Sequence, residues 1–546
     1  MKLVSVEQMR NFENEANNNG LSFPTMMQNA GIGLGKEIHR IAHSHIGDSV
    51  NILGLVGPGN NGGDTLIALT FLSELNFQVT AYLINREIEK DQLLMKFNTM
   101  GGKTINCKGK GNFIELKELI KNCEILVDGV LGTGFKLPLK SDIKNPLQHV
   151  NRILSELENR PIVLAVDCPS GIDNDTGEVS EETIPADFTF CMAALKQGLL
   201  KLPAFEFTGK FRTIDIGFNE KNSSLNLVKR QVADEKLINS FKLKRPLDAH
   251  KGTFGTALIV AGSLNYTGAV LLAGKAAYRV GVGLVTLGIP SSLHATLAGH
   301  FPEATWLLLP NEMGSIAGPA ATVLMKNFEK ANALLIGCGL GTEETTYDFI
   351  ETLLCNSSTT KKNQDRIGFV KNIGMHDLDQ NYKIPPLVID ADGLNLLAKI
   401  PEWPKILSEN TILTPHPGEM EALTGVSKEK IQANRLSVAE HFAKEWQQIV
   451  VLKGAFTVIA SPDGSTTTIP VATPALARAG SGDVLAGMIV GFRAQGMDAY
   501  RSAITGAWYH AIAGLLASES MGGETSIVAG DIIETISKAI SLGDSG

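Results

Sequence analysis

The chain has 546 residues, of which 44% are hydrophobic and 19% are charged, and its formal net charge is −8. A length of several typical domains of ~150 residues excludes a single small module, and the acidic balance excludes broad binding of nucleic acid. Because no apolar run reaches the ~18 residues needed to span a bilayer, no membrane partner is expected.

The amino terminus and the cysteines indicate the compartment. Glu7, Glu13 and Glu15 interrupt the region where a secretory signal would be continuously apolar, so export by a cleaved signal is not expected. The six cysteines lie far apart and form no CxxC pair, which excludes a disulfide framework and a zinc knuckle. A reducing, cytoplasmic location fits this pattern best.

The first half of the chain has the pattern of a parallel sheet covered by helices. Short apolar runs at 50–56, 79–84, 124–130 and 161–167 alternate with helix-like stretches such as 66–76. This alternation predicts βαβ units and a sheet that is covered on both faces. The polar segment 219–234 shows little apolar periodicity and marks the expected domain boundary.

The same alternation restarts in the second half and predicts another α/β domain. Its short apolar runs lie at 255–262, 284–289, 333–339, 386–393, 411–416 and 449–454. Residues 457–469 form two strand-like stretches around a Pro-Asp-Gly turn, so the second sheet is expected to contain an antiparallel hairpin. Most of the polar segment 356–386 is interpreted as a surface insertion.

Three loops of the first half carry candidate chemistry. The glycine-rich segment 57–64 follows a strand and opens a helix, so its backbone N–H groups can bind a phosphate; a purely steric use of its glycines is the alternative. The loops 128–134 and 167–171 begin with Asp128 and Asp167 at the carboxyl ends of strands, where open α/β sheets bind ligands. We expect the three loops to meet at one rim.

Two kinds of chemistry fit this rim. The oxygen atoms of Asn61, Asp128 and Ser170 suit an alkali or alkaline-earth cation, and a hydrogen-bonded loop network is the alternative. Asp167 is the candidate for acid–base catalysis. Cys168 is a weaker candidate for a nucleophile, because no histidine lies near it in sequence and buried cysteines are usually inert.

Taken together, the strings GPGNNGGD, DGVLGTG and DCPSGIDNDTG resemble the YjeF amino-terminal domain, the NAD(P)H-hydrate epimerase family, over nearly all of residues 1–220. The resemblance implies a Rossmann-like three-layer domain in which Asp167 is catalytic and Asn61, Asp128 and Ser170 bind K⁺. It assigns substrate binding to Asn60, Asn61, Gly62, Gly63, Asp64, Gly132, Thr133, Gly134, Phe135, Lys136, Leu137, Pro138 and Asp167. Thr65 and Cys168 depart from the family, which usually has glycine and valine there.

In the second half, segment 479–487 precedes an apolar helix, so its N–H groups form an anion site at the positive helix end beside Asp483. A carboxylate next to an anion site suits phosphoryl transfer, because it can orient or deprotonate an attacking hydroxyl; a helix cap is the alternative. The GSGD motif at 480–483 resembles the ribokinase-like superfamily.

Other polar residues of the second half have two interpretations each. Two prolines fix the backbone around His416, as a substrate contact requires, although a lone histidine is more often structural. Asp390 and Asp392 either bind Mg²⁺ through nucleotide phosphates or cap the helix that follows.

The strings HKG at 250–252, AGSLNYTGAVLLAGKAAYRVG, IGCGLG, DADGLN, TPHPGEM and VLKGAFTVIASPDG resemble the carboxyl-terminal YjeF domain, the ADP- or ATP-dependent NAD(P)H-hydrate dehydratase, over roughly 235–540. The resemblance assigns hydrate binding to Ala269, the turn from Gly339 to Gly341, His416 and Asp483, with Asp483 catalytic. It assigns ADP binding to Lys453, Gly454, Ala455, Phe456, Thr457 and Gly482.

The expected organisation is therefore an epimerase domain at 1–220, a linker at 221–234 and a ribokinase-like dehydratase domain at 235–546. The resemblance implies an enzyme that interconverts the R and S forms of hydrated NADH and NADPH, called NADHX and NADPHX, and dehydrates the S form with ADP, releasing AMP and phosphate. ADP is favoured because bacterial two-domain members usually use it, and ATP stays open. K⁺ and Mg²⁺ are the implied ions.

Two other functional classes stay open at this stage. The GSGD loop also suits a small-molecule kinase, which would accumulate a phosphorylated product. The first half is alternatively a non-catalytic binding module, for which the Thr65 departure is the one supporting feature. Glycine-rich α/β domains often assemble, so a homo-oligomer is expected.

Overall fold

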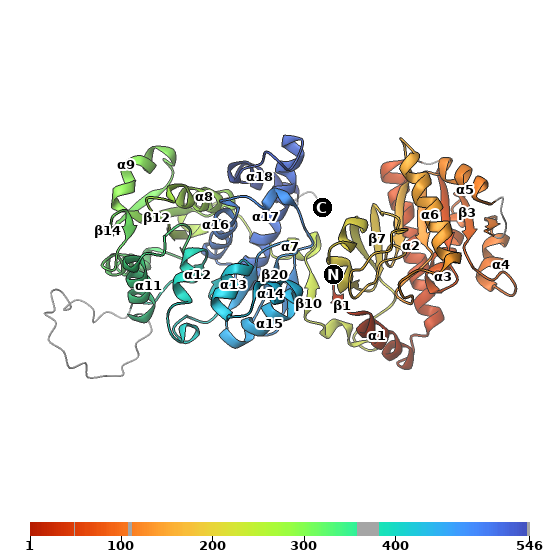
Figure 1. Ribbon diagram of the computed structural model, residues 1–546, viewed down its shortest axis with the longest axis horizontal. Helices are drawn as coiled ribbons and strands as arrows, with labels where there is room; N and C mark the ends of the chain where they lie inside the picture. The colour runs from red at the N-terminus through yellow and green to blue at the C-terminus, as the bar shows by residue number, and fades with distance from the viewer. Residues whose placement is uncertain (48–49, 108–111, 357–381, 543–546) are drawn as a thin grey trace. The chain divides into compact units, whose positions relative to one another are not determined.

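The computed structural model describes residues 1–47, 50–107, 112–356 and 382–542. The chain divides into two compact units, Met1–Val232 and Ala233–Gly546 (Figure 1). The expected surface insertion at 356–386 lies almost wholly outside the described residues. Among the helices that are described, none combines the length and the apolar character that crossing a membrane requires.

A seven-stranded sheet forms the centre of the first unit, with the order β4-β3-β2-β5-β6-β7-β9. Each strand pairs with its neighbours in parallel, as the alternation of apolar runs predicts. The strands are β2 (Asn51–Val56), β3 (Gln78–Leu83), β4 (Lys103–Asn106), β5 (Ile125–Gly129), β6 (Ile162–Val166), β7 (Phe188–Met192) and β9 (Lys210–Ile214). A separate short pair joins β1 (Leu3–Val4) to β8 (Leu195–Lys196).

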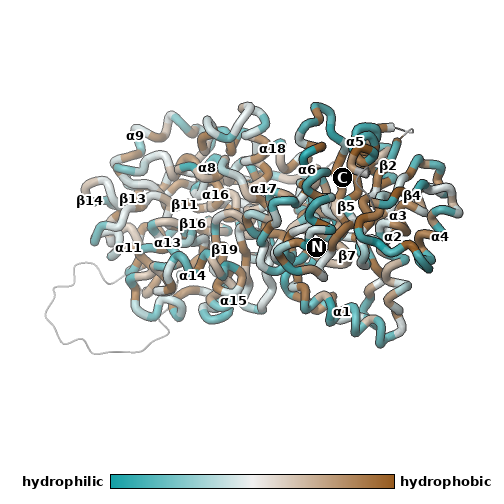
Figure 2. The backbone as a smooth tube through the Cα atoms, turned by 45° about the vertical axis from the view of Figure 1, so that its right-hand side comes forward, coloured by the Kyte–Doolittle hydropathy of each residue, from teal (hydrophilic) through white to brown (hydrophobic). Residues whose placement is uncertain are grey.

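Alternate side chains of these strands enter two different cores, which makes the first unit three layers thick. Ile52 and Val56 of β2 pack in one core, whereas Leu53 and Leu55 pack in the other. The first core lies under α1 (Val6–Asn18), α2 (Phe23–His45), α3 (Asn60–Glu74) and α4 (Gln92–Thr99), and the second under α5 (Asn112–Lys121) and α6 (Ser141–Glu156). Brown, apolar backbone gathers around β5 in Figure 2.

The segment 221–234, expected as a linker, is mostly part of the first unit. It contains the 3₁₀ helix η3 (Ser224–Leu227) and strand β10 (Arg230–Val232). Ser224 donates its backbone N–H and its hydroxyl to Glu15 Oε2, at 2.9 and 2.7 Å, and Val232 N–H donates to Met1 O at 2.8 Å. The boundary between the two units therefore falls after Val232.

The sheet of the second unit runs in the order β21-β20-β19-β18-β17-β16-β11-β12-β13. The expected hairpin is confirmed, because β20 pairs antiparallel with β21 and with β19. The strands are β11 (Thr256–Val260), β12 (Leu284–Pro290), β13 (Thr305–Leu309), β16 (Ala333–Ile336), β17 (Leu387–Ile389), β18 (Ile412–Leu413), β19 (Ile449–Leu452), β20 (Val458–Ala460) and β21 (Thr466–Thr468), with a separate pair of β14 (Asn311–Glu312) and β15 (Ser315–Ile316).

Helices cover both faces of this second sheet, and two cores again separate alternate side chains. Ala257 and Ile259 of β11 enter one core, and Leu258 and Val260 enter the other. One face carries α7 (Glu235–Asn239), α8 (Thr267–Arg279), α9 (His294–Leu297), α16 (Ser481–Ala494), α17 (Ala499–Met521) and α18 (Ala529–Leu542). The other carries α10 (Ala320–Met325), α11 (Glu344–Asn356), α12 (Asp392–Leu397), α13 (Pro417–Thr424), α14 (Lys428–Ala433) and α15 (Arg435–Trp446). The expected α/β class is confirmed for both units.

Candidate functional sites

The three predicted loops of the first unit line one cavity of about 840 Å³. Its wall includes residues 58–61 after β2, residues 130–135 after β5 and Asp167 after β6. The cavity therefore lies at the carboxyl ends of the parallel strands, where such sheets bind ligands. Of the predicted substrate-binding residues, Asn60, Asn61, Asp64, Gly132, Thr133, Gly134, Phe135 and Asp167 line it, while Gly62, Gly63, Lys136, Leu137 and Pro138 are not among its lining residues.

Helix α3 presents its amino terminus to this cavity. Its N-cap is Gly59, and no side chain caps it, so the N–H groups of the first turn are available to an anion. Gly62 and Gly63 are glycines for reasons of packing, since an added Cβ would lie 2.1 Å from Gly57 O or 2.9 Å from Met27 Sδ. The steric interpretation therefore applies to Gly62 and Gly63, and phosphate binding by the N–H groups at the start of α3 stays a prediction.

Asp167 has an uncommon backbone conformation and pairs with a buried lysine. Its φ of 64° lies in the left-handed region, which a non-glycine residue seldom adopts. Oδ1 of Asp167 accepts the Met192 N–H at 3.0 Å and a short ion-pair contact from Lys196 Nζ. Burial, the largest single effect, lowers the pKa of Lys196, but Asp167 and the neighbouring thiols of Cys191 and Cys168 together raise it, and the net shift is upward. Lys196, which is 1% exposed, thus stays charged and stabilises the carboxylate of Asp167.

Two more carboxyl groups line the same cavity. Glu13 reaches it from α1 and Asp64 from α3. Burial raises the pKa of both groups, and the carboxylate of Asp167 adds to each rise. The cavity thus combines one paired carboxylate with two carboxyl groups whose pKa values are raised, that of Asp64 well above the usual range.

Asn61, which lines the cavity, and Asp128 and Ser170 lie together around Leu131, and these are the three residues predicted for a cation site. Ser170 donates its hydroxyl to Asp128 Oδ1 at 2.6 Å and its N–H to Oδ2 at 2.8 Å. Asn61 Nδ2 donates to the carbonyls of Leu131 and Val166 at 3.0 and 2.5 Å. Asp128 is fully buried, and burial raises its pKa. A buried carboxylate surrounded by neutral oxygen atoms fits an alkali cation, which would supply the missing positive charge.

The two departures from the family pattern are accommodated within the fold. Thr65 is fully buried and donates its hydroxyl to Asn61 O at 2.7 Å, so α3 stays regular through this position. Cys168 is also fully buried, and burial raises the pKa of its thiol, which accepts the amide N–H of Asn174 at 3.1 Å. A thiol that stays protonated is a poor nucleophile.

In the second unit, the GSGD motif lies at the amino terminus of α16. Gly480 is the N-cap, with a φ of 85°, and carries no side-chain cap. Burial and the neighbouring Asp390 raise the pKa of Asp483 to about 6, although the Cys338 thiol and Lys453 oppose the rise. Asp483 therefore does not act as the helix cap, and its pKa lies near neutrality, as a general base requires.

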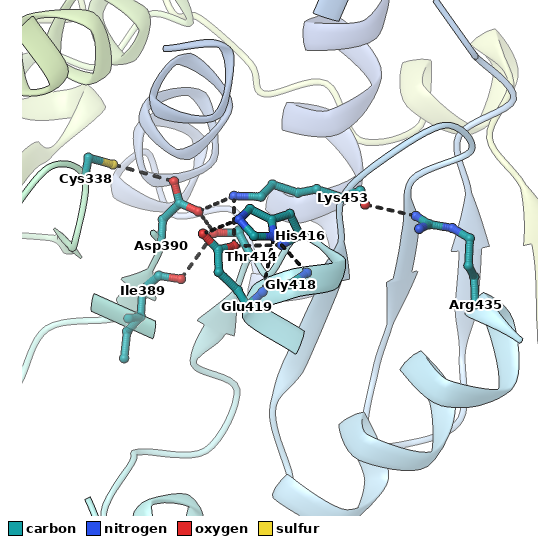
Figure 3. Close-up of polar contacts among 9 residues, drawn as sticks. All are labelled: Cys338, Ile389, Asp390, Thr414, His416, Gly418, Glu419, Arg435 and Lys453. Carbon is teal, nitrogen blue, oxygen red and sulfur yellow. Dashed lines mark hydrogen bonds and ion pairs between the residues drawn. The ribbon is translucent and has the colours of Figure 1, made fainter. Parts of the chain in front are cut away.

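Next to this helix end, the largely buried Lys453 pairs with two further carboxylates (Figure 3). Lys453 Nζ lies 2.6 Å from Asp390 Oδ1 and 3.5 Å from Glu419 Oε2. An added Cβ at Gly482 would lie 3.6 Å from the same Nζ, so the open face of Gly482 adjoins the lysine. The cluster thus brings the predicted nucleotide-binding residues Lys453 and Gly482 together.

The remaining predicted residues border this cluster. A Cβ on Gly339 would meet Ala269 Cβ at 3.0 Å, which places the turn from Gly339 to Gly341 against α8. Asp392 Oδ2 accepts the Gly341 N–H at 3.0 Å, and no side chain caps α12. The predicted ADP segment Lys453, Gly454, Ala455, Phe456 and Thr457 follows β19, and Gly454 and Phe456 both have positive φ.

His416 caps a helix and also adjoins the lysine cluster. Its Nδ1 accepts the N–H groups of Gly418 and Glu419 at 3.0 and 3.1 Å, at the start of α13. Its Nε2 lies 3.2 Å from Glu419 Oε1, and the side chain is 55% exposed. Burial and the charge of Lys453 lower the pKa of His416. The structural interpretation is therefore correct for Nδ1, and the exposed ring edge stays accessible to a ligand.

Several polar residues of these sites were absent from the sequence-based set. Lys196 is the one lysine within the apolar run from Cys191 to Leu200, and this isolated charge was the available signal. Glu419 follows His416 in the same proline-bracketed string. Cys338 donates to Asp390 Oδ2 at 3.6 Å, and nothing in the sequence pairs these two positions.

Comparison with known proteins assigns both units to families. Residues 24–198 match the family model of the YjeF-related protein N-terminus, and residues 257–360 and 372–538 match that of the NAD(P)H-hydrate dehydratase. Among solved structures, the ADP/ATP-dependent NAD(P)H-hydrate dehydratase of Bacillus subtilis, co-crystallised with ATP and Mg²⁺, covers 57% of this chain and 98% of its own at 27% identity, with a TM-score of 0.45.

Curated relatives match nearly the whole chain. The bifunctional NAD(P)H-hydrate repair enzyme of Moorella thermoacetica is 32% identical over 520 residues, which cover 93% of this chain and 91% of the relative. The enzyme of the same name from Thermofilum pendens is 31% identical, over 96% of this chain and 94% of the relative. With both units matched in this order, the chain belongs to the family of bifunctional NAD(P)H-hydrate repair enzymes.

Proposed function

We propose that the first unit epimerises hydrated NADH and NADPH and that the second dehydrates the S form, with ADP as the phosphoryl donor. The observation that carries the second assignment is the position of Asp483 at the amino terminus of α16, in the cluster that holds Lys453 and the open face of Gly482. A base, a cation and helix N–H groups at one point are what phosphoryl transfer to a substrate hydroxyl requires.

The dehydration follows from the chemistry of the substrate. Hydrated NAD(P)H has a hydroxyl at C6 and lacks the C5=C6 double bond, and hydroxide is a poor leaving group. Asp483 accepts the hydroxyl proton while the oxygen attacks the terminal phosphorus of ADP, which releases AMP. Phosphate then leaves C6 and takes up the proton that C5 loses, and the C5=C6 double bond is restored. The N–H groups of α16 and Lys453 stabilise the charge on the transferred group.

The first unit supplies the substrate that this step needs. A site shaped for the S form leaves the R form unused unless another site interconverts them. We assign the role of base to Asp167, which lines the cavity and is paired with Lys196. The substrate phosphates bind at the amino terminus of α3 and along Gly132 to Phe135.

Ions and assembly complete the proposal. K⁺ would be held by Asn61, Asp128 and Ser170, where it neutralises the buried carboxylate. Mg²⁺ would enter with the nucleotide phosphates next to Asp390. A homo-oligomer in the cytoplasm stays a prediction from the sequence, and the described cysteines are all free thiols, as a reducing compartment requires.

The test is the repair of a mixture of S and R NADHX by the pure protein, with ADP or ATP added separately. Absorbance of the restored dihydronicotinamide reports the reaction. Repair of the whole mixture is expected with ADP. A stall after the S fraction would contradict epimerisation by the first unit, and a stable phosphorylated product without restored NADH would favour a small-molecule kinase.

A matched pair of variants tests the role of Asp483. Asp483→Asn is expected to abolish dehydration of the S form while nucleotide binding persists, because the amide cannot accept the hydroxyl proton. Asp248→Asn changes an exposed carboxylate of the same unit and is expected to leave the rate unchanged. Turnover retained in Asp483→Asn would contradict the assignment.

A further inference from the structure

The cavity of the first unit contains more carboxyl groups than its base requires. Glu13, Asp64 and Asp167 all line it, and Lys196 is the buried cation beside them. Arg10, which also lines the cavity, interacts with Glu13. Buried charges in proteins are paired or neutralised, so a single buried lysine accounts for one buried carboxylate.

Lys196 forms its ion pair with Asp167, and Asp64 forms no ion pair with any of the described residues. Both the Lys196 ammonium and the Met192 N–H contact Oδ1 of Asp167. Asp64 is 6% exposed, and its Oδ1 is buried with no hydrogen-bond partner among the described residues. A buried carboxylate in that state is costly, whereas a protonated carboxyl group that faces a ligand cavity is not.

The surroundings of Asp64 favour its protonated form. Burial raises its pKa well above the usual range, the charges of Asp167 and Glu13 raise it further, and Lys196 only partly opposes them. The groups that face Asp64 thus come from α1, from the loop after β6 and from β8. The carboxyl group of Asp64 does not suit phosphate binding. If it were ionised it would repel a phosphate, and Asp64 lies one turn into α3, away from the free N–H groups at the start of the helix.

We propose that Asp64 is a second catalytic residue of the epimerase site: a protonated Asp64 is the acid that acts together with the base Asp167. This proposal rests on the proposed function of the first unit. The substrate supplies the hydrogen-bond acceptor that the carboxyl group lacks in the free protein. An epimerisation needs such a pair, because a bond to C6 must break and form again on the other face.

The step balances without any added reagent. C6 carries the hydroxyl and is bonded to the ring nitrogen N1. Asp167 accepts the hydroxyl proton, the C6–N1 bond breaks to leave an aldehyde at C6, and Asp64 donates its proton to N1. After rotation about the C5–C6 bond, N1 attacks the other face of the aldehyde. N1 returns its proton to Asp64, and Asp167 returns its proton to the oxygen, so each carboxyl group ends as it began.

The first experiment compares Asp64→Asn, Asp167→Asn and the control Asp142→Asn, an exposed carboxyl group of the same unit, in the full chain. Each is assayed for repair of R-NADHX in the presence of ADP. Asp64→Asn is expected to lower kcat for R-epimer repair by about 10²-fold or more with KM little changed, because the amide keeps the shape and cannot donate the proton. Asp142→Asn is expected to match the wild type.

The same chain provides the control for folding. Repair of S-NADHX depends on the second unit, so an unchanged S-epimer rate shows that the second unit is intact. Folding of the first unit is checked by its own transition in urea, which Asp64→Asn is expected to keep. Suppose that the wild type epimerises NADHX, that Asp167→Asn abolishes this activity and that Asp64→Asn leaves it unchanged. That result would overturn the role of Asp64 but not that of Asp167. Absence of epimerisation in the wild type would instead overturn the proposed function of the first unit.

Two measurements on the wild-type protein do not depend on any variant. If Asp64 is the acid, the epimerisation rate falls as pH rises through the ionisation of Asp64, and a rate that is flat or rises there would contradict it. In H₂¹⁸O, ring opening keeps the original oxygen on C6. Incorporation of ¹⁸O in every turnover would show loss of water from C6 and would overturn proton donation to N1.

Discussion

At the residue scale, the pair of Lys196 and Asp167 has the largest energetic consequence. Both side chains are buried, at 1% and 7% exposure, and Asp167 has a left-handed backbone. A buried ion pair contributes little net stability when intact, but removal of one partner leaves an uncompensated charge. Removal of one member alone is therefore expected to destabilise the first unit more than removal of both.

This dependence predicts the behaviour of Lys196→Met. The variant is expected to destabilise the first unit by about 3–5 kcal/mol, because the carboxylate of Asp167 loses its counter-charge. The double variant Lys196→Met with Asp167→Asn is expected to recover most of that loss while epimerisation stays abolished. Urea denaturation of both proteins checks this, and a double variant as unstable as the single one would contradict it.

Asp483 gives a second prediction, for pH dependence. Burial raises its pKa to about 6, and the base form is the carboxylate, so dehydration of the S form is expected to be half-maximal near pH 6 and to level off above it. The effect on folding has the opposite sign. The folded state binds more protons than the unfolded state between about pH 4 and about pH 6, so this group lowers stability as pH rises through that window.

Rate and stability profiles of the second unit in wild type and Asp483→Asn check both statements. The variant is expected to lose the stability decline between about pH 4 and about pH 6. A dehydration rate that decreases with pH across this range in the wild type would exclude Asp483 as the base.

At the scale of elements, each candidate site includes one helix amino terminus, and in α16 the glycines have two distinct roles. In α16, an added Cβ at Gly487 would lie 2.2 Å from the backbone oxygen of Ala273, so this glycine permits close packing on α8. An added Cβ at Gly482 would have Lys453 Nζ and Asp390 Oδ2 as its nearest atoms, at 3.6 and 3.9 Å. The space beside Gly482 is therefore open to a ligand.

The two glycines are therefore expected to respond differently to alanine. Gly482→Ala is expected to fold with equal or higher stability, by up to about 1 kcal/mol, and to bind ADP more weakly because the methyl group occupies the anion site. Gly487→Ala is expected to lose about 1–3 kcal/mol of stability, because the backbone of α8 must move. Thermal unfolding and ADP titration separate the two effects, and equal destabilisation would contradict this distinction.

The sequence predicted elements more completely than contacts. Runs such as 50–56 and 449–454 became β2 and β19, because a strand buried on both faces must be continuously apolar. The loops at strand ends were predicted to converge, since parallel strands end at one edge. Lys196 and Glu419 were missed because their partners, Asp167 and Lys453, are distant in sequence. Hydrophobic periodicity does not encode such pairs.

At the scale of the whole molecule, each unit has its own two cores and its own candidate site. The apolar clusters of Met1–Val232 and of Ala233–Gly546 share no residue. Units with separate cores are able to unfold separately. Neither candidate site takes a described residue from the other unit.

Unfolding in urea is therefore expected to show two transitions. ADP at about 100 times its Kd is expected to raise the stability of the second unit by about 2.7 kcal/mol and to leave the first unit unchanged. Hydrogen exchange followed by mass spectrometry assigns each transition to its unit. A single cooperative transition that ADP shifts as a whole would contradict this independence.

The pairing of Lys453 with Asp390 and Glu419 affects how readily the second site releases a bound nucleotide. If the nucleotide phosphate binds at Lys453, as proposed above, it exchanges one ion pair for another, so the net gain in free energy is smaller than for a lysine with no partner. When the nucleotide product leaves, Lys453 pairs again with Asp390 and Glu419. The arrangement lowers the affinity for the nucleotide and makes release of the nucleotide product easier. This suits an enzyme that must exchange its nucleotide after every molecule it repairs.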